Sequence, residues 1–305
     1  MSFLILSAVL AIEEYWSSSQ PKRLIGLVER YGDWLGRRFN GGQPHQGLFA
    51  WAMGALLPAI AVGVIAGLLA WAVGILGWLW AGVAVYFCLG FKASHNYANR
   101  IATALRVGDL AEAREELKAM RPGSVEALGD SDVAKLALEE MLRAGFARLL
   151  GVIFWFVLLG PFGAVLFRLT HVLHDYWHTH IPERDEFLSH VDRLRQLLDW
   201  LPVRAAAFSF AIAGNFQGAM ECWRNQAWQW WERNEGVLLA AGAGAIGVKL
   251  GGAIPLPNGS IERAELGAGA TADADYLDGA TALIWRVALF WLALLFLMKL
   301  GELAA

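Results

Sequence analysis

The chain has 305 residues, of which 57% are apolar and only 17% are Asp, Glu, Lys or Arg. Soluble domains usually contain about 45–50% apolar and about 25% charged residues. This composition, with a mean hydropathy of +0.42, excludes an ordinary water-soluble enzyme, because too little charge is present to cover its surface. The net charge of −3 provides no basic field for nucleic acid. We therefore expect a protein of the lipid bilayer.

The N-terminal part of the chain predicts one short helix and one hairpin. Met1–Ile12 is apolar but too short to cross a bilayer, so we expect an interfacial or partly inserted helix. Residues 40–91 contain no Asp, Glu, Lys or Arg, which is enough length for two membrane-crossing helices. We place these helices at Gly47–Ala70 and Ala72–Phe91, with a turn near Gly74–Gly77.

Basic residues flank both outer ends of this predicted hairpin. Arg37 and Arg38 precede it, and Lys92 and Arg100 follow it. Because Lys and Arg near membrane helices favour the cytoplasmic side, both ends of the hairpin are predicted to lie in the cytoplasm.

A polar interval at about residues 92–148 predicts helices outside the bilayer. Asp109 is placed to cap a helix whose third position is Glu112, which is the capping-box arrangement. A further helix is predicted to begin near Asp130–Asp132. We interpret residues 1–305 as a single membrane domain that carries this interval as a polar helical insertion.

The second half of the chain contains three more predicted membrane segments. Leu149–Phe167 is interrupted by Gly160-Pro161, which predicts a kink. An amphipathic helix that Pro202 is expected to end then leads into Val203–Met220, and the last segment is about Thr281–Leu300. The predicted fold is all-α and polytopic, with about five membrane-inserted helices plus amphipathic interfacial and cytoplasmic helices.

A glycine run matches the dinucleotide-binding fingerprint in letters only. Gly242, Gly244 and Gly247 have the required spacing, and Lys249 follows them. The fingerprint has meaning only between a strand and a helix of a βαβ unit, and no such pattern surrounds it. Close helix packing through small residues is the simpler interpretation. The alternative is a glycine turn whose amides, with Lys249, hold a phosphate or another anion.

Three histidines suggest a metal site. His171, His174 and His178 lie in a segment expected to be a loop after the Leu149–Phe167 span. If the segment is helical, they share one face, because their spacings are three, four and seven residues. Imidazole nitrogens bind zinc and similar divalent metals. Interfacial polar residues beside a membrane span are the simpler alternative.

An arginine is predicted at the entrance of a membrane segment. Arg204 follows Pro202 directly, and Asp199 lies on the helix before it. Ionisable groups at membrane depth are costly unless they face a polar cavity. We therefore expect a cavity near Arg204 and Asp199 that binds an anionic ligand.

Four blocks of sequence, taken in order, resemble the CobD/CbiB family of membrane cobalamin-biosynthesis proteins and its sister branch, the β-lactamase-induction protein AmpE. The blocks are Gly108-Asp109-Leu110 with Ala113-Arg114, Phe154-Trp155 through Gly160–Ala164 to Arg168, Leu198–Arg204, and Asn234-Glu235-Gly236 with Ala243–Gly252. The first and last look more like the cobalamin branch, and the middle two look closest to the AmpE branch. The resemblance implies a multi-pass protein of a bacterial inner membrane.

The cobalamin branch implies ATP-dependent amide ligation, which joins an aminopropanol phosphate unit to adenosylcobyric acid. ATP and Mg²⁺ are expected only if this activity is retained, because the family's acidic motifs are replaced here. The family's Arg-Asp pair reads Arg121-Pro122 here, so the aspartate is replaced by proline. The other acidic motifs fall on Arg143, Ala144, Ala147, Arg148, Arg195 and Gln196. Carboxylates normally hold Mg²⁺ against nucleotide phosphates. The family's anion-binding residues are better retained, namely Arg204, Lys249 and the glycine run.

Two hypotheses follow from the resemblance. In the first, the chain is a divergent CobD/CbiB-type protein that binds a phosphate-bearing corrinoid or nucleotide, with its ligase activity left open. In the second, it is an AmpE-like membrane modulator without catalysis, which acts on β-lactamase induction or envelope signalling through a membrane protein partner.

Overall fold

A computed structural model of the chain describes residues 2–15, 20–121, 123–181 and 186–304, and most of these residues are helical. The all-α prediction is therefore confirmed. The chain forms two compact units, each assembled from segments that are separated in the sequence. Unit 1 consists of Met1–Gly90, Ala147–Pro202 and Leu294–Ala305, and unit 2 consists of Phe91–Phe146 and Val203–Ala293.

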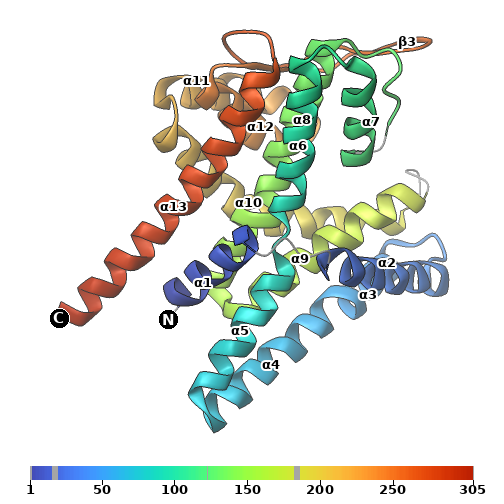
Figure 1. Ribbon diagram of the computed structural model, residues 1–305. Coiled ribbons are helices and arrows are strands. Elements are labelled where there is room, and N and C mark those ends of the chain that lie inside the picture. The colour runs from blue at the N-terminus through green and yellow to red at the C-terminus, as the bar shows by residue number, and fades with distance from the viewer. Residues whose placement is uncertain (1, 16–19, 122, 182–185, 305) are drawn as a thin grey trace. The chain divides into compact units, whose positions relative to one another are not determined.

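The helices of each unit can be followed by their labels in Figure 1. Those of unit 1 are α1 (Ser2–Tyr15), α2 (Gln20–Phe39), α3 (Pro44–Trp51), the π-helical turn η1 (Ala52–Leu56), α4 (Leu57–Ala72), α5 (Gly74–Cys88) and α9 (Gly151–His180). Those of unit 2 are α6 (Phe91–Arg106), α7 (Leu110–Met120), α8 (Asp130–Gly145), α11 (Phe216–Gln226), the 3₁₀ turn η3 (Ala227–Gln229) and α12 (Arg233–Ile246). The turn η2 (Phe146–Leu150) joins α8 to α9, and α10 (Phe187–Ala213) and α13 (Ala274–Ala304) contribute residues to both units.

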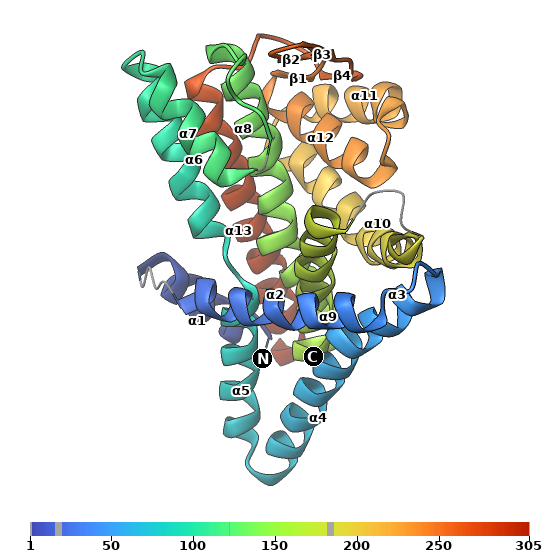
Figure 2. The same ribbon diagram turned by 90° about the vertical axis from the view of Figure 1, so that its right-hand side faces the viewer.

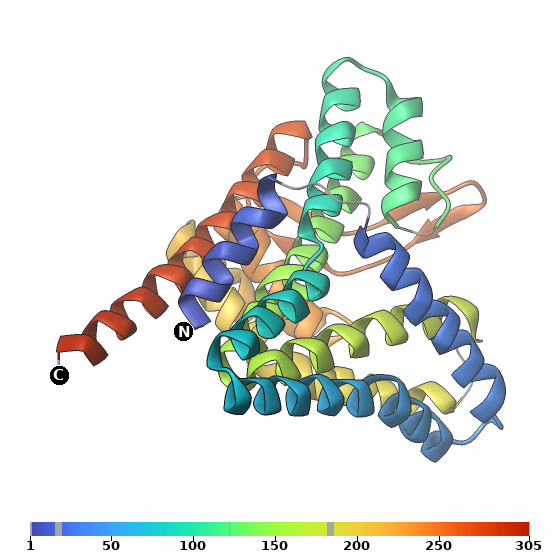
Figure 3. The ribbon, with the colours of Figure 1, turned by 60° about the horizontal axis from the view of Figure 1, so that its bottom comes forward.

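The predicted hairpin is present in unit 1. α4 and α5 are separated by Val73 alone, one residue before the predicted turn. The indole nitrogen of Trp80 donates a hydrogen bond across the hairpin to the Val62 carbonyl, at 3.2 Å. Both arms contact α9, whose course beside them can be followed by colour in Figure 3. The predicted N-terminal helix is α1, although Met1 itself lies outside the described residues.

Among the described residues, four helices are long and apolar enough to cross a membrane. They are Pro44–Ala72, Gly74–Arg106, Asp130–His180 and Ala274–Glu302. The predicted span Val203–Met220 is wrong as a single helix, because α10 ends at Ala213 and α11 begins at Phe216. The break occurs where Asn215 caps α11 by accepting a hydrogen bond from the Gly218 amide at 2.9 Å.

Pro202 does not end the amphipathic helix, which corrects the sequence prediction. Proline has no N–H, so the carbonyl four residues earlier loses its helical partner. That carbonyl belongs to Leu198, and the indole nitrogen of Trp155 donates to it at 3.1 Å. Because the vacated acceptor is satisfied by α9, α10 continues through the proline to Ala213.

The kink at Gly160-Pro161 is confirmed, but the histidine segment is not a loop. Gly160 has φ 64° and ψ −153°, a conformation open mainly to glycine, and helical geometry resumes after it. α9 then continues to His180, so the predicted loop is the last part of this helix.

Unit 2 contains the predicted polar helices and a small β segment that was not predicted. Asp109 caps α7 by accepting a hydrogen bond from the Glu112 amide at 2.9 Å, which confirms the predicted cap. Pro122 lies outside the described residues. Between α12 and α13, β1 (Lys249–Gly251) pairs antiparallel with β4 (Glu265–Gly267), and β2 (Ile254–Leu256) pairs with β3 (Gly259–Ile261). Figure 2 shows these strands together beside α11 and α12.

Candidate functional site

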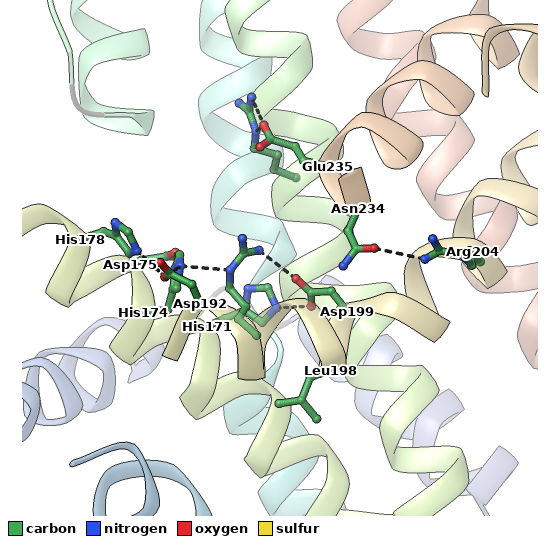
Figure 4. Close-up of polar contacts among 12 residues, drawn as sticks. His171, His174, Asp175, His178, Asp192, Leu198, Asp199, Arg204, Asn234 and Glu235 are labelled. Atoms are coloured by element: carbon green, nitrogen blue, oxygen red, sulfur yellow. Dashed lines mark hydrogen bonds and ion pairs between the residues drawn. The ribbon is translucent and has the colours of Figure 1, made fainter. Parts of the chain in front are cut away.

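Each unit contains a cluster of ionisable side chains, and Figure 4 shows the histidines and aspartates of the first together with Glu235 of the second. The first, which we call the histidine cluster, consists of His171, His174, His178, Asp175, Asp192, Arg195 and Asp199, all in unit 1. The second, which we call the arginine network, consists of Glu139, Arg143, Glu235 and Arg263, all in unit 2. They are described separately.

In the histidine cluster, His171 and Asp199 are paired with each other. The Nε2 atom of His171 lies 2.8 Å from Oδ1 of Asp199, and both side chains are nearly completely buried. The other carboxylate oxygen of Asp199 accepts a hydrogen bond from Nη1 of Arg195 at 2.9 Å. The predicted metal ligand His171 and the predicted anion-site residue Asp199 therefore satisfy each other in this structure.

His174 and His178 instead face Asp192 of α10. Oδ1 of Asp192 lies 3.1 Å from Nε2 of His174 and 2.7 Å from Nε2 of His178. Burial alone would raise the pKa of Asp192, but the hydrogen bonds from the two histidines outweigh it and hold that pKa below its usual value. Asp192 was not predicted as a partner of the histidines, because it lies 14 residues after His178 and no motif links the two positions.

In the arginine network, Glu139 of α8 is completely buried and fully compensated. Its two oxygens accept hydrogen bonds from Nη1 and Nη2 of Arg263 at 2.7 and 2.9 Å. The Gly251 amide donates a third, at 3.0 Å. A bidentate arginine–carboxylate pair with an additional amide donor is the arrangement that a buried carboxylate requires.

Arg143 connects Glu139 to α12. Its guanidinium donates twice to Oε1 of Glu235 and lies 3.5 Å from Glu139 and 3.6 Å from Glu140. The next residue of the Asn-Glu-Gly block, Gly236, packs so closely on η3 that a Cβ atom would lie 2.2 Å from the Ala227 carbonyl oxygen. The close packing of Gly236 on η3 therefore fixes the positions of its neighbours Asn234 and Glu235 at the start of α12.

Arg204 has a partner in the same block. Its Nη1 atom donates to the side-chain oxygen of Asn234 at 3.2 Å. Burial lowers the pKa of Arg204. The predicted anion-site residue is thus half-buried and lies beside α12, within unit 2.

Arg121 carries a free donor next to the network. Its Nη1 atom is buried, and no hydrogen-bond partner is found for it among the described residues. Burial lowers the pKa of Arg121, and the positive charge of Arg143 lowers it further. A buried guanidinium nitrogen without an acceptor is costly, so this position favours an anion.

The glycine run is a packing element for most of its length. Gly242 and Gly244 lie inside α12, where their amides belong to the helix. A Cβ atom would lie 2.8 Å from the Leu142 side chain at Gly242, and 2.3 Å from the Gly218 carbonyl oxygen at Gly244. This corrects the glycine-turn interpretation for these two residues. Gly247 does form a turn, with φ 72° at the end of α12, and the exposed Lys249 follows in β1.

The network does not fit the Mg²⁺ that an ATP-dependent ligase requires. Magnesium needs carboxylate oxygens that are free to enter an octahedral shell. Both oxygens of Glu139 are taken by Arg263, and Glu235 is held by Arg143. Arg263 and Glu139 were missed by sequence reasoning, because they are 124 residues apart and neither lies in a recognised motif.

Comparisons with known proteins agree on one family. The family described as "CobD/Cbib protein" matches residues 6–285. The Cobalamin biosynthesis protein CobD of Stutzerimonas stutzeri is 35% identical over 285 residues, covering 90% of this chain and 91% of that protein. The protein of the same name from Chromobacterium violaceum is 34% identical over 210 residues, covering 69% of this chain and 67% of that protein. No solved structure matches the chain significantly.

Proposed function

The chain belongs to the CobD/CbiB family of cobalamin-biosynthesis proteins, and from this membership we propose that it binds a phosphate-bearing corrinoid or nucleotide in a bacterial inner membrane. The observation that carries the proposal is the buried, unpartnered guanidinium nitrogen of Arg121. A phosphate oxygen accepts such a donor with a charge-assisted hydrogen bond, and arginine matches phosphate geometry better than lysine does.

We propose unit 2 as the position of the ligand, because Arg121 lies beside the arginine network and Arg204 contacts Asn234 there. Arg143 and Arg263 are already paired with glutamates. They therefore serve to hold Glu139 and Glu235 in place, while Arg121 supplies the donor that remains available. Lys249 and Gly247 stand as a further anion-binding position at the end of α12.

Binding is tested on the purified full-length chain in detergent micelles, with a phosphorylated corrinoid and ATP as separate probes. We expect Arg121→Gln to weaken binding of the probe by about tenfold, because a hydrogen bond between charged groups contributes about 1.5–3 kcal/mol. The matched control is Arg233→Gln, which removes the same charge from an exposed position in the first turn of α12. Equal binding by wild type and Arg121→Gln would reject this site, and Arg204→Gln and Lys249→Gln then decide between the two other positions.

Catalysis is tested by complementation of a bacterial strain that lacks the adenosylcobinamide-phosphate synthase. The paired carboxylates of the arginine network favour binding without ligation, so we expect no growth rescue while the protein is present in the membrane. Rescue would assign the ligase activity to this chain.

The same paired carboxylates favour a second candidate function, the AmpE-like modulator. It predicts that deletion of the gene changes β-lactamase induction or an envelope stress response and leaves cobinamide processing intact. Unchanged induction in the deletion strain would count against it.

A further inference from the structure

Three ligand-type atoms converge between the last turns of α9 and the start of α10. They come one each from His174, His178 and Asp192, and all three lie within 4.8 Å of one another. The Nε2 atoms of both histidines contact Oδ1 of Asp192. The two histidines are one helical turn apart, with ring centroids separated by 4.3 Å. Figure 4 shows both rings directed toward the aspartate of the neighbouring helix.

We propose that His174, His178 and Asp192 bind a single divalent transition-metal ion, for which zinc is the reference metal. Zinc takes histidine nitrogen and carboxylate oxygen at about 2.0–2.2 Å, which places tetrahedral ligand atoms about 3.4 Å apart. Oδ1 of Asp192 is already 2.7 and 3.1 Å from the two nitrogens. To receive the ion, the nitrogens of His174 and His178 therefore have to move away from Oδ1 by about 0.3 and 0.7 Å.

Asp175 provides the outer contact that metal-bound histidines usually have. Its Oδ1 atom lies 3.2 Å from Nδ1 of His174. A carboxylate at Nδ1 keeps the ring proton on that nitrogen and leaves the Nε2 lone pair for a metal. Without a metal, a proton on Nε2 joins His174 to the Asp192 carboxylate, and a bound cation takes the place of that proton.

The two helices that carry the ligands are held in register. Trp177 lies between His174 and His178 in sequence, and its ring packs on Phe187 of α10 at a centroid distance of 5.4 Å. Its indole nitrogen donates to the Gly32 carbonyl at 2.9 Å. Further from the ligands, the indole nitrogen of Trp155 on α9 donates a hydrogen bond to the Leu198 carbonyl on α10. Fixed ligand positions of this kind reduce the ordering cost of metal binding.

In the absence of a metal, Arg195 occupies one of the proposed ligand atoms. Its Nε atom lies 3.1 Å from Nε2 of His174, while its Nη1 atom holds Asp199. A metal at His174 replaces the first contact and leaves the second. The positive charge of Arg195 opposes the metal, so removing that charge is expected to tighten metal binding.

The site is open to solvent on one side. The side chains of His178 and Asp192 are 36% and 33% exposed, whereas His174 is 13% exposed. Three protein ligands with an accessible fourth position are typical of zinc sites that keep a water or substrate ligand. Two imidazole nitrogens also favour zinc over Mg²⁺, which prefers oxygen ligands.

The test uses the full-length chain in detergent micelles, with any affinity tag removed. The protein is dialysed against buffered Zn²⁺, and its bound metal is measured by mass spectrometry. We expect one zinc ion per chain, no Mg²⁺ at the same concentration, and a loss of at least about tenfold in affinity for His178→Ala and for Asp192→Asn. Asp175→Asn is expected to weaken zinc about tenfold, in the range for outer-shell carboxylates.

Two matched histidine variants separate the site from general histidine binding. His180→Ala changes an exposed histidine two residues further along α9, and His171→Gln changes the histidine that is paired with Asp199. Both are expected to retain one zinc ion, and Arg195→Gln is expected to bind it more tightly. Circular dichroism and gel filtration verify that each variant is folded.

The proposal is overturned if the wild type takes up no stoichiometric zinc, or if His178→Ala and Asp192→Asn bind zinc as the wild type does. Equal losses in His180→Ala would also overturn it, because they would show non-specific uptake. The ligands belong to unit 1 and the proposed phosphate-binding residues to unit 2. Zinc content and corrinoid or nucleotide binding are therefore separate readouts, and failure of one does not decide the other.

Discussion

The carboxylate of Glu139 is completely buried and contacts Arg263, whose side chain is 3% exposed. Replacing Glu139 by Leu leaves Arg263 buried without its counter-ion. Breaking a buried ion pair from one side costs about 3–5 kcal/mol, because the remaining charge stays desolvated. We expect Glu139→Leu to lower the free energy of unfolding by this amount, measured by denaturant titration in detergent micelles.

A surface pair and a double variant test the reason for this loss. Arg100 and Glu116 form an exposed pair between α6 and α7, so Glu116→Leu is expected to cost about 0–1 kcal/mol. The double variant Glu139→Leu/Arg263→Met removes both charges and is expected to be more stable than Glu139→Leu alone. If the double variant is the less stable one, lost packing rather than an unpaired charge explains the effect.

Residues whose role depends on near neighbours in the sequence were predicted well. Asp109 caps the helix that its spacing to Glu112 predicted, and Gly160 marks the predicted kink. Contacts between distant segments were not predictable, because periodicity and capping report only local structure. Asp192 replaces His171 beside His174 and His178 for this reason, since the choice depends on how α10 packs against α9.

At the scale of elements, α11 and α12 approach each other closely through glycine. At Gly244 of α12, a Cβ atom would lie 2.3 Å from the carbonyl oxygen of Gly218 of α11. Gly244→Ala therefore forces the helices apart, and we expect it to lower the free energy of unfolding by about 1–3 kcal/mol.

Gly279 of α13 is the matched control for this prediction. It is also a helical glycine, but a Cβ atom there meets nothing within 4 Å. Because alanine is the better helix former, Gly279→Ala is expected to raise the free energy of unfolding by about 0.5–1 kcal/mol. The same denaturant titration measures the free energy of unfolding of both variants. If Gly244→Ala also raises this free energy, the higher helix propensity of alanine outweighs the loss of close packing at Gly244.

The kink in α9 gives a second prediction for a helix. Gly160 has φ 64° and ψ −153°, a region that is essentially limited to glycine. Gly160→Ala is expected to cost about 1–3 kcal/mol of stability through backbone strain, measured as a lower midpoint of thermal unfolding. Gly67→Ala in α4, where the added Cβ meets nothing within 4 Å, is expected to leave the midpoint unchanged or slightly raised.

The elements also show where a strong sequence signal was misleading. Proline normally ends or kinks a helix, yet α10 continues through Pro202 because Trp155 takes the Leu198 carbonyl. The compensating donor is 43 residues away, so the local sequence around Pro202 contains no trace of it. The short strands after α12 were missed for a similar reason, since three-residue strands are too brief to show alternation.

At the scale of the whole molecule, the four apolar helices set the chain's relation to the bilayer. The helix from Pro44 to Ala72 has 29 residues, which at 1.5 Å per residue is about 44 Å and exceeds the ~30 Å hydrocarbon core. Arg37 and Arg38 precede this helix and Lys92 follows its partner, so the positive-inside rule predicts that Val73 lies on the side opposite the cytoplasm.

Cysteine labelling in spheroplasts checks this topology. Val73→Cys is expected to react with a membrane-impermeant maleimide from outside, and Gln43→Cys only after permeabilisation. The wild type serves as the control because Cys88 and Cys222 are 5% and 2% exposed, so neither is expected to react. Reaction of both variants from outside without permeabilisation would show that the first arm of the hairpin does not cross the bilayer. Reaction of Gln43→Cys alone would reverse the orientation, which would mean that charges beyond the hairpin determine it.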